Sequence, residues 1–440
     1  MIRNSKSCYV AFSRIASCLS QGFGYNSAMG KQGKATTDKP EQSIQCQTLH
    51  FFSPSTKQWK EALDGSEDKK EIERELLSSL QMHNLVVLAG SGTSIFAGGP
   101  TMKDLWAHCL DEKKTELKLP AKLENCRDNS EGNIERFLSL CEASIECEMD
   151  QEKKAEIEDF IKSCRDVIRF QCSKFLLIDI NPENKLEPHC LFLHKLIRRR
   201  VRDPRLKVFT TNYDLCFEDA AAMIGLPVID GFSFSFPNTF DPRYFDYDIV
   251  KRSRLSDERG DYLEGVFHLY KLHGSVNWYR ESDGRIKKNG LENKDDVDYC
   301  MIYPAKGKFQ QSYAQPYIET ISRFMSVLRE PNTCLLVVGF GFNDDHLSEP
   351  ILSAIKNNPH MKIVIIDLKA KDNYCHPEQG NSNLFQRELY RRVSNGMKNI
   401  ILVNSSFHQF AQCIPDLKAL SKGEEIEQFI CDVVRPRSEQ

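Results

Sequence analysis

Three short polar segments of this chain carry side chains that can do chemistry on a nucleotide. In chain order they are a Gly-rich turn at 90–94, the pair Asn212 and Asp214, and His273 followed by a glycine. A Gly-rich turn can cradle phosphate, an Asn offers both a donor and an acceptor, and an imidazole can accept a proton. The occurrence of all three segments in this order predicts a nucleotide site with a proton-transfer group.

The Gly-rich turn follows the apolar run 84–89, which predicts a buried strand. Its two glycines let the backbone turn tightly and approach a pyrophosphate, and we expect free N–H groups and hydroxyls there to donate to the oxygens. Ile95 excludes the dinucleotide fingerprint, and no Gly-Lys-Ser/Thr of a P-loop occurs. A plain structural turn is an equal alternative. The candidate nucleotide-binding residues here are Gly90, Ser91, Gly92, Thr93 and Ser94.

The polar residues of the second and third segments also follow apolar runs. Asn212 and Asp214 lie two positions apart and can face one side. The alternative is an Asx-turn that caps the following helix, which explains Asp214 well and Asn212 less well. His273 is a candidate general base, and the alternative is a buried imidazole satisfied by backbone carbonyls. His346 is a competing base or a helix cap. A metal site of His and Asp is conceivable, but the spacing supports nothing definite.

The elements that must position these residues alternate between short apolar runs and helical patterns. This alternation is the sequence form of a parallel sheet with helices on both faces, where ligands bind after the strand ends. The predicted fold class is α/β, a doubly wound, Rossmann-like, mostly parallel sheet. The predicted strands are 84–89, 207–211, 266–272, 334–340, 362–368 and 399–403, and the predicted helices include 66–82, 102–110, 189–200, 215–224 and 347–357.

We predict one catalytic domain over residues 66–440, with a helical insertion at about 111–200 that caps the strand ends. Residues 1–45 are expected to form a disordered extension. The first 37 residues contain no Asp or Glu, which resembles an organelle transit peptide. A floppy extension ahead of a true start at Met29 is the alternative that we favour.

Composition narrows the class of protein. An apolar fraction of 40%, a mean hydropathy of -0.46 and the lack of an 18-residue apolar run predict a globular protein without a transmembrane helix. A net charge of -3 argues against nonspecific nucleic-acid binding. The 16 cysteines include no Cys-x-x-Cys pair, which disfavours a disulfide framework or a zinc module and favours a reducing cytosol.

Taken together, the motifs resemble those of the sirtuin (silent information regulator two) superfamily. Its members carry a G-[AS]-G-x-S turn, a T-x-N-x-D strand end, a catalytic H-G and a late Gly-rich strand end. Here these are Gly90–Ser94, Thr210–Asp214, His273–Gly274 and Gly339–Gly341. The resemblance covers roughly residues 80–412.

The departures from that family are informative. Deacylating sirtuins carry two Cys-x-x-Cys pairs after the catalytic His and a T-Q-N-x-D segment, whereas this chain has no such pair and reads Thr-Thr-Asn-Tyr-Asp. Gly-Phe-Gly-Phe-Asn-Asp-Asp-His-Leu replaces their G-T-S. These variants are similar to the sirtuin-like NADases of prokaryotic antiphage defence, which lack the zinc module.

The resemblance implies a catalytic pair, Asn212 and His273, acting on NAD as substrate without a metal. Asn212 would hold a ribose hydroxyl or the attacking water, and His273 would take a proton. Asp214 would orient Asn212 or its loop. The further NAD-binding candidates are Thr211, Asp214, Gly339, Gly341 and Asp344.

The function predicted on this basis is an NAD glycohydrolase that depletes NAD when triggered, as an antiphage effector in abortive infection. One alternative is a non-catalytic NAD or ADP-ribose binding subunit of a larger assembly. A second alternative, disfavoured by the missing zinc module, is an NAD-dependent protein deacylase. The resemblance implies a cytoplasmic homo-oligomer with a HerA-type ATPase or an argonaute-like partner. No membrane association and no direct sequence-specific nucleic-acid binding are expected.

Overall fold

The computed structural model describes residues 49–53, 58–63, 65–177, 182–199, 203–251, 261–289, 297–303, 314–375 and 382–417. The extension expected over residues 1–45 lies outside this part of the chain. All of these described residues belong to one compact unit. Among the described helices, none is both long enough and apolar enough to cross a membrane.

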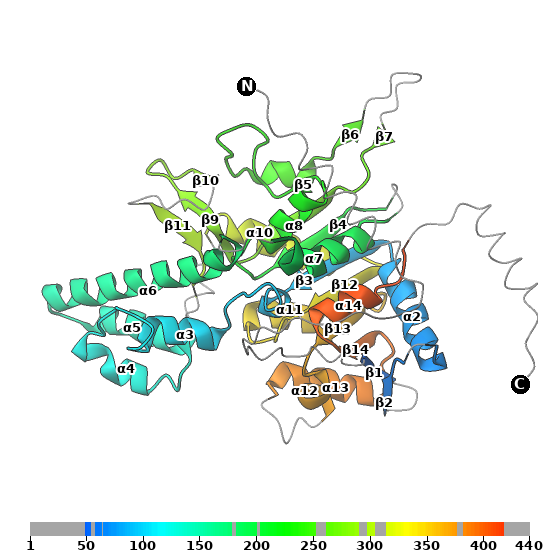
Figure 1. The fold of residues 1–440 in the computed structure, drawn as a ribbon, viewed down its shortest axis with the longest axis horizontal. Coiled ribbons are helices and arrows are strands. Elements are labelled where there is room, and N and C mark those ends of the chain that lie inside the picture. Colours follow the sequence, from blue (N-terminus) through cyan, green and yellow to red (C-terminus); the bar gives the residue numbers. More distant parts are fainter. Residues whose placement is uncertain are drawn as a thin grey trace, which may run out of the picture. The chain divides into compact units, whose positions relative to one another are not determined.

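The described residues form a central sheet of nine strands in the order β2-β1-β14-β13-β12-β3-β4-β8-β5 (Figure 1). The seven strands from β14 to β5 pair in parallel, whereas β1 and β2 add an antiparallel edge. This confirms the predicted doubly wound, mostly parallel α/β fold. The strands are β1 His50–Ser53, β2 Gln58–Glu61, β3 Asn84–Ala89, β4 Leu206–Thr210, β5 Val228–Ile229, β8 Phe267–Lys271, β12 Thr333–Val338, β13 Lys362–Asp367 and β14 Ile400–Asn404.

Alternate residues along the central strands enter two separate hydrophobic cores, one on each face of the sheet. In β3, Val86 and Leu88 enter one core, and Val87 and Ala89 the other. Such double burial explains why these strands read as continuous apolar runs. Helices α10 Tyr317–Val327, α11 Asp345–Asn357, α12 Ala370–Cys375 and α13 Leu384–Ser394 cover the first face, and α2 Glu67–Leu80, α7 Pro182–Leu196, α8 Cys216–Met223 and α14 Phe407–Cys413 the second.

The carboxyl ends of four adjacent strands lie in register. Val338 of β12 pairs with Ala89 of β3, Ala89 pairs with Thr210 of β4, and Thr210 pairs with Lys271 of β8. The segments that follow these strands therefore emerge side by side at one edge of the sheet. All the sequence-predicted site residues belong to these segments.

A third hydrophobic core holds a cluster of helices beside the sheet (cyan to green, left in Figure 1). Its helices are α3 Met102–Leu110, α4 Glu124–Asp128, α5 Ile134–Cys147 and α6 Gln151–Leu177. A capping box of Thr101 and Asp104 starts α3, and the Asn133 side chain caps α5. Packing assigns α3 to this cluster and α7 to the sheet, while the insertion bounds of 111–200 stay a prediction.

Two smaller sheets and three 3₁₀ turns complete the described fold. The three-stranded sheet β10-β9-β11 was not anticipated from the sequence, and its strand β9 begins directly after His273. The remaining elements are β6 Val250–Lys251, β7 Asp261–Tyr262, β9 Gly274–Arg280, β10 Ile286–Lys288, β11 Asp298–Met301, η1 Ser91–Thr93, η2 Ala121–Leu123 and η3 Pro242–Asp246.

Several predicted bounds are corrected by local geometry. The strand predicted over 334–340 ends at Val338, because Gly339 turns with φ of +61°. The helix predicted over 189–200 runs from Pro182 to Leu196. Arg199 therefore lies beyond its own helix, and it donates instead to three carbonyls at the end of α2, those of Leu80, Met82 and His83.

Candidate functional site

The Gly-rich turn after β3 is packed against the end of β12. Gly90 N donates to Val338 O at 3.0 Å, and Gly92 N donates to Gly339 O at 2.9 Å. A Cβ added to Gly92 would stand 2.6 Å from Gly339 Cα, and one on Gly90 would stand 2.6 Å from Gly339 O. Glycine is therefore required here because two backbones touch, whatever ligand binds nearby.

The donors of this turn point mostly inward, which corrects the expectation of free N–H groups. The N–H groups of Thr93 and Ser94 donate to Gly90 O at 3.0 Å and Ser91 O at 3.1 Å. The Thr93 hydroxyl also donates to Gly90 O, at 2.8 Å. Ser91 is the exposed residue among the five, so its hydroxyl is the one best placed to meet a ligand.

Asn212 ties the segment after β4 to this turn. Its Nδ2 lies 3.0 Å from Gly90 O, 3.1 Å from Thr93 Oγ1 and 2.9 Å from Ser94 Oγ. Because a carbonyl can only accept, the bond to Gly90 fixes which end of the amide is the NH₂ group. The Oδ1 end is then the part of Asn212 that can serve a ligand or a water.

Asp214 completes the same network. Ser94 Oγ donates to Asp214 Oδ2 at 2.6 Å, and Cys216 N at the start of α8 donates to Oδ1 at 3.1 Å. Asp214 thus makes the Asx-turn foreseen as an alternative, and through Ser94 it also orients Asn212. We call Gly90–Ser94, Asn212 and Asp214 together the Asn212 wall.

Lys271, the last residue of β8, holds the backbone of the Asn212 wall through its side chain. It was not identified as a site residue from the sequence. Its side chain is 1% exposed. Nζ donates to the carbonyl of Asp214, to that of Tyr213 at 3.4 Å, and to Glu218 Oε1 at 3.0 Å. Burial raises the pKa of Glu218, and the Lys271 charge opposes that rise.

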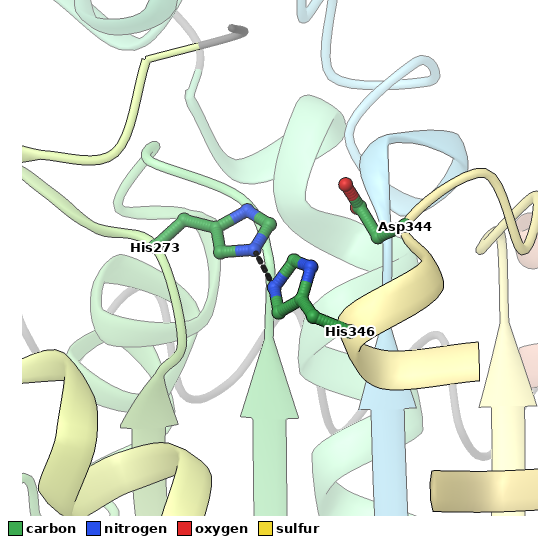
Figure 2. Close-up of side chains that lie close together, drawn as sticks. All are labelled: His273, Asp344 and His346. Atoms are coloured by element: carbon green, nitrogen blue, oxygen red, sulfur yellow. Dashed lines mark hydrogen bonds between the residues drawn. The ribbon is translucent and has the colours of Figure 1, made fainter. Parts of the chain in front are cut away.

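His273 stands across from this network on a separate support. Its Nε2 lies 3.2 Å from Nε2 of His346, and the ring planes are inclined by 32° (Figure 2). His273 follows β8, and its carbonyl accepts from Ile302 N at 2.9 Å. His346 lies in the first turn of α11, beside the N-cap residue Asp344. We call His273, Asp344 and His346 the His273 wall.

A cavity of about 430 Å³ opens between the two walls. Nine of the twelve predicted site residues line it. The other three, Gly90, Gly92 and Thr93, belong to the same turn as the lining residues Ser91 and Ser94. The lining members are Ser91, Ser94, Thr211, Asn212, Asp214, His273, Gly339, Gly341 and Asp344. The structure therefore brings the four motif segments to one place.

Residues of the helical cluster also line the cavity and were not singled out in the sequence. Asn133 and Glu135 come from the start of α5, where Asn133 Oδ1 accepts from Glu135 N at 2.9 Å. An Asn before an apolar helix is a recognisable N-cap, but only the packing shows that it faces a cavity. Cys172 of α6 lines the cavity too, and burial raises the pKa of its thiol, which disfavours a thiolate nucleophile.

The segment after β12 is held by the start of α13. Asn383 Nδ2 donates to the carbonyls of Gly341 and Phe342, each at 3.0 Å. Phe342 has φ of 56°, and its buried ring stacks on Phe385 at 4.5 Å. This clamp fixes the path of the chain from Gly339 to Asp344, which forms one side of the cavity.

Part of the chain matches the model of a known protein family. Residues 206–387 match the model of the SIR2-like domain. Three of the four motif segments, Thr210–Asp214, His273–Gly274 and Gly339–Gly341, fall within that match. It confirms the sirtuin-like resemblance drawn from the motifs.

The chain is also similar to solved structures at low sequence identity. Sir2Tm bound to a propionylated peptide is 12% identical, with a TM-score of 0.37 and coverage of 77% of this chain and 95% of that chain. A complex of Sir2, a p53 peptide and NAD⁺ is 14% identical, with a TM-score of 0.36 and coverage of 78% and 95%. A complex of a Sir2 homologue with NAD is 12% identical, with a TM-score of 0.36 and coverage of 78% and 93%. No curated protein matches the chain.

Proposed function

We propose that this sirtuin-like protein, whose SIR2-like domain spans residues 206–387, is an NAD glycohydrolase that cleaves NAD to nicotinamide and ADP-ribose. The observation that carries the proposal is the cavity between the Asn212 wall and the His273 wall. It lies at the carboxyl ends of β3, β4, β8 and β12, where open α/β sheets bind nucleotides. Its volume of about 430 Å³ falls within the usual range for a small-molecule site.

The chemistry required is modest. A water oxygen forms a bond to the anomeric ribose carbon while the bond from that carbon to the nicotinamide nitrogen breaks. The electron pair of that bond leaves with nicotinamide, which becomes neutral, and the water gives up one proton. The nicotinamide ring is already positively charged and leaves as a neutral molecule, so the step needs no Lewis acid to stabilise the leaving group. We therefore propose that it proceeds without a metal.

His273 is the proposed acceptor of the proton. It lines the cavity, and its backbone is fixed between β8 and β9. A neutral imidazole held in this way can act as a general base on the water or on a ribose hydroxyl.

Asn212 is the proposed partner of His273, and it acts through the end of its amide that the turn does not use. The NH₂ group of Asn212 donates to the Gly-rich turn. Its Oδ1 atom can therefore accept a hydrogen bond from the attacking water or from a ribose hydroxyl. Ser94 and Asp214 hold that amide in place. Asp214 is therefore a positioning residue in this scheme.

The remaining lining groups fit the other parts of the substrate. Glu135, Asp214 and Asp344 are carboxylates on the cavity lining, and they suit a cationic nicotinamide ring or the positive charge that develops on the ribose. Ser91 is the proposed contact to the pyrophosphate. Gly339 and Gly341 leave backbone exposed to the adenosine side, with Thr211 and Asp344 as ribose contacts.

An assay of products separates this proposal from its alternatives. Purified wild-type protein is incubated with NAD, with and without an acetyl-lysine peptide, and nicotinamide and ADP-ribose are quantified by chromatography. Equal amounts of both products without the peptide are expected. Products that require the peptide would indicate a deacylase, and NAD that stabilises the protein against heat but stays intact would indicate a non-catalytic binding module.

For the cell, we propose a triggered, NAD-depleting effector of antiphage defence, in line with the sirtuin-like NADase branch. Free hydrolysis of NAD would harm the host, so we expect low turnover in the isolated protomer and higher turnover in a homo-oligomer or with a HerA-type ATPase or other defence partner. Native mass and specific nicotinamide release, measured over a range of protein concentrations, test this. A specific rate that stays high and flat where only monomer exists would contradict it.

A further inference from the structure

The His273 wall brings three metal-ligating side chains together from two distant segments of the chain. His273 follows β8, whereas Asp344 and His346 lie at the start of α11. One ligand atom from each residue lies within 4.8 Å of the other two (Figure 2). The sequence spacing gave no definite metal site, because the cluster depends on β8 and β12 ending at the same edge of the sheet.

The distance between the two imidazoles suits a shared metal ion. Two nitrogens bound to one tetrahedral Zn²⁺ at about 2.0–2.1 Å stand roughly 3.3 Å apart. The Nε2 atoms of His273 and His346 are 3.2 Å apart. The two Nε2 atoms face each other, so a cation bound by both would replace the contact between them (Figure 2).

Asp344 supplies the third donor in a suitable position. It is the N-cap residue of α11, yet its side chain makes no capping bond to the helix. Its carbonyl accepts from Leu347 N at 3.1 Å and Ser348 N at 2.9 Å, so the backbone beneath the carboxylate is rigid. His273 is equally fixed through its carbonyl bond to Ile302 N. Ligands held by rigid segments lose little freedom when they bind an ion.

We propose that His273, His346 and Asp344 form a binding site for one divalent transition-metal ion of the Zn²⁺ class. Two imidazoles and one carboxylate are typical ligands of such ions, whereas Mg²⁺ and Ca²⁺ prefer oxygen ligands alone. His273 and Asp344 both line the cavity, so the fourth coordination position faces open space and takes a water.

The bound ion has a consequence for the cleavage reaction, which rests on the proposed function. The lone pair on Nε2 of His273 that binds the metal is then not available for a proton. A metal-loaded site is therefore inactive in NAD hydrolysis, and removal of the ion restores the base. The site would act as an inhibitory switch rather than as a catalytic centre.

Cobalt binding tests the site without any reference to activity. Tag-free, metal-stripped full-length protein is titrated with Co²⁺, and visible absorption and bound metal per chain are measured. One Co²⁺ per chain with the intense absorption of a tetrahedral site is expected, and equimolar Zn²⁺ should displace it whereas Mg²⁺ should not. Absence of saturable Co²⁺ binding in the wild-type protein would overturn the proposal.

Substitution of each proposed ligand tests whether that residue binds the metal. His273→Ala and His346→Ala should each weaken Co²⁺ binding by more than about 100-fold, since loss of a direct ligand exceeds the 10–100-fold typical of outer-shell changes. Asp344→Asn should weaken it by at least about tenfold, whereas the adjacent Asp345→Asn is the matched control and should bind like the wild-type protein. Circular dichroism checks that each variant is folded. Binding unchanged in both histidine variants would place the metal elsewhere and overturn the site.

Measurement of nicotinamide release distinguishes a failure of the metal-site proposal from a failure of the proposed function. Stoichiometric Zn²⁺ should suppress release at least tenfold, and EDTA should restore it. Activation by Zn²⁺ would overturn the inhibitory role. If the metal-free protein binds Co²⁺ but never releases nicotinamide, the proposed hydrolase fails while the metal site stands.

Discussion

The two walls of the cavity are built in opposite ways. On the Asn212 wall the polar groups are spent on one another, because the Asn212 amide, the Ser94 hydroxyl and the Asp214 carboxylate form one buried chain of hydrogen bonds. On the His273 wall the two imidazoles face each other, and His273 and Asp344 line the cavity. The first wall sets the shape of the site, and the second presents groups that can exchange protons or bind an ion.

This difference divides the two members of the predicted catalytic pair. Both follow strand ends in the sequence and look equivalent there. In the structure, Asn212 supports the Gly-rich turn through its NH₂ group and can serve chemistry only through Oδ1. His273 instead faces His346 of α11, with 3.2 Å between the two Nε2 atoms. A substitution should therefore act on stability at one wall and on the reaction at the other.

The largest effect on stability is expected beneath the Asn212 wall. Lys271→Met removes the charge that Glu218 faces and the donor to the Asp214 and Tyr213 carbonyls. Breaking a fully buried pair from one side typically costs about 3–5 kcal/mol. Because the Glu218 side chain is 25% exposed, we expect a loss at the lower end of that range, about 3 kcal/mol, in the free energy of unfolding. Urea denaturation measures it.

The matched control is the double variant Lys271→Met with Glu218→Gln, which removes both charges. It should recover part of the loss, because no half-buried carboxylate is left without its cation. A single variant within about 0.5 kcal/mol of the wild-type protein, the range of ordinary surface changes, would show that Lys271 does not support the wall.

A smaller loss is expected where the glycines of the two strand ends meet. Gly92→Ala places a Cβ 2.6 Å from Gly339 Cα, and both groups are backbone-fixed, so the strands must separate. Overpacking of this kind costs about 1–3 kcal/mol. Gly341→Ala is the control, because its Cβ would meet only the Asn343 side chain, at 3.2 Å. Thermal unfolding should separate the two variants, and equal melting temperatures would contradict the contact.

A pH dependence is also expected behind the Asn212 wall. His189 of α7 is fully buried between Phe217 and Phe407, and burial lowers its pKa from 6.5 to about 4. The unfolded chain therefore takes up a proton near pH 6.5 and the folded chain only near pH 4. Native stability is full above pH 6.5 and falls by up to about 1.4 kcal/mol per pH unit between 6.5 and 4.

The variant His189→Phe isolates this contribution. It keeps an aromatic ring between the two phenylalanines and removes the titrating group, so stability should fall less steeply below pH 6.5. His268, whose pKa burial also lowers to about 4, remains in the variant and keeps part of the slope. Denaturation midpoints at pH 7.5, 6 and 5 provide the measurement. Parallel curves for wild-type and variant protein would contradict the assignment.

The sequence predicted the sheet well because its strands are buried on both faces. The run 84–89 corresponds to β3, and the motif residues follow β3, β4, β8 and β12 as expected. The short sheet around β9 was missed, since Val276 and Trp278 alternate over too few residues beside the stronger His-Gly motif. Periodicity identifies buried strands more readily than short, twisted ones.

The site was predicted as a set of positions but not as a set of contacts. Lys271 stands in an apolar strand, and its partner Glu218 lies 53 positions away, so no local pattern pairs them. The inward hydrogen bonds of Thr93 and Ser94 depend on the 3₁₀ turn. His346 meets His273 only because the sheet order brings β8 and β12 to one edge. These features follow from tertiary structure, which residue types and spacing do not specify.

One measurement tests the division between the walls most directly. Asn212→Ala and His273→Ala are compared with wild-type protein for both unfolding free energy and metal-free nicotinamide release. We expect His273→Ala to lose about 10²–10⁴-fold in release with little change in stability, as for a general base. Asn212→Ala should lose activity and also about 1–3 kcal/mol of stability, because it leaves buried partners unsatisfied. Near wild-type release by folded His273→Ala protein would contradict the account.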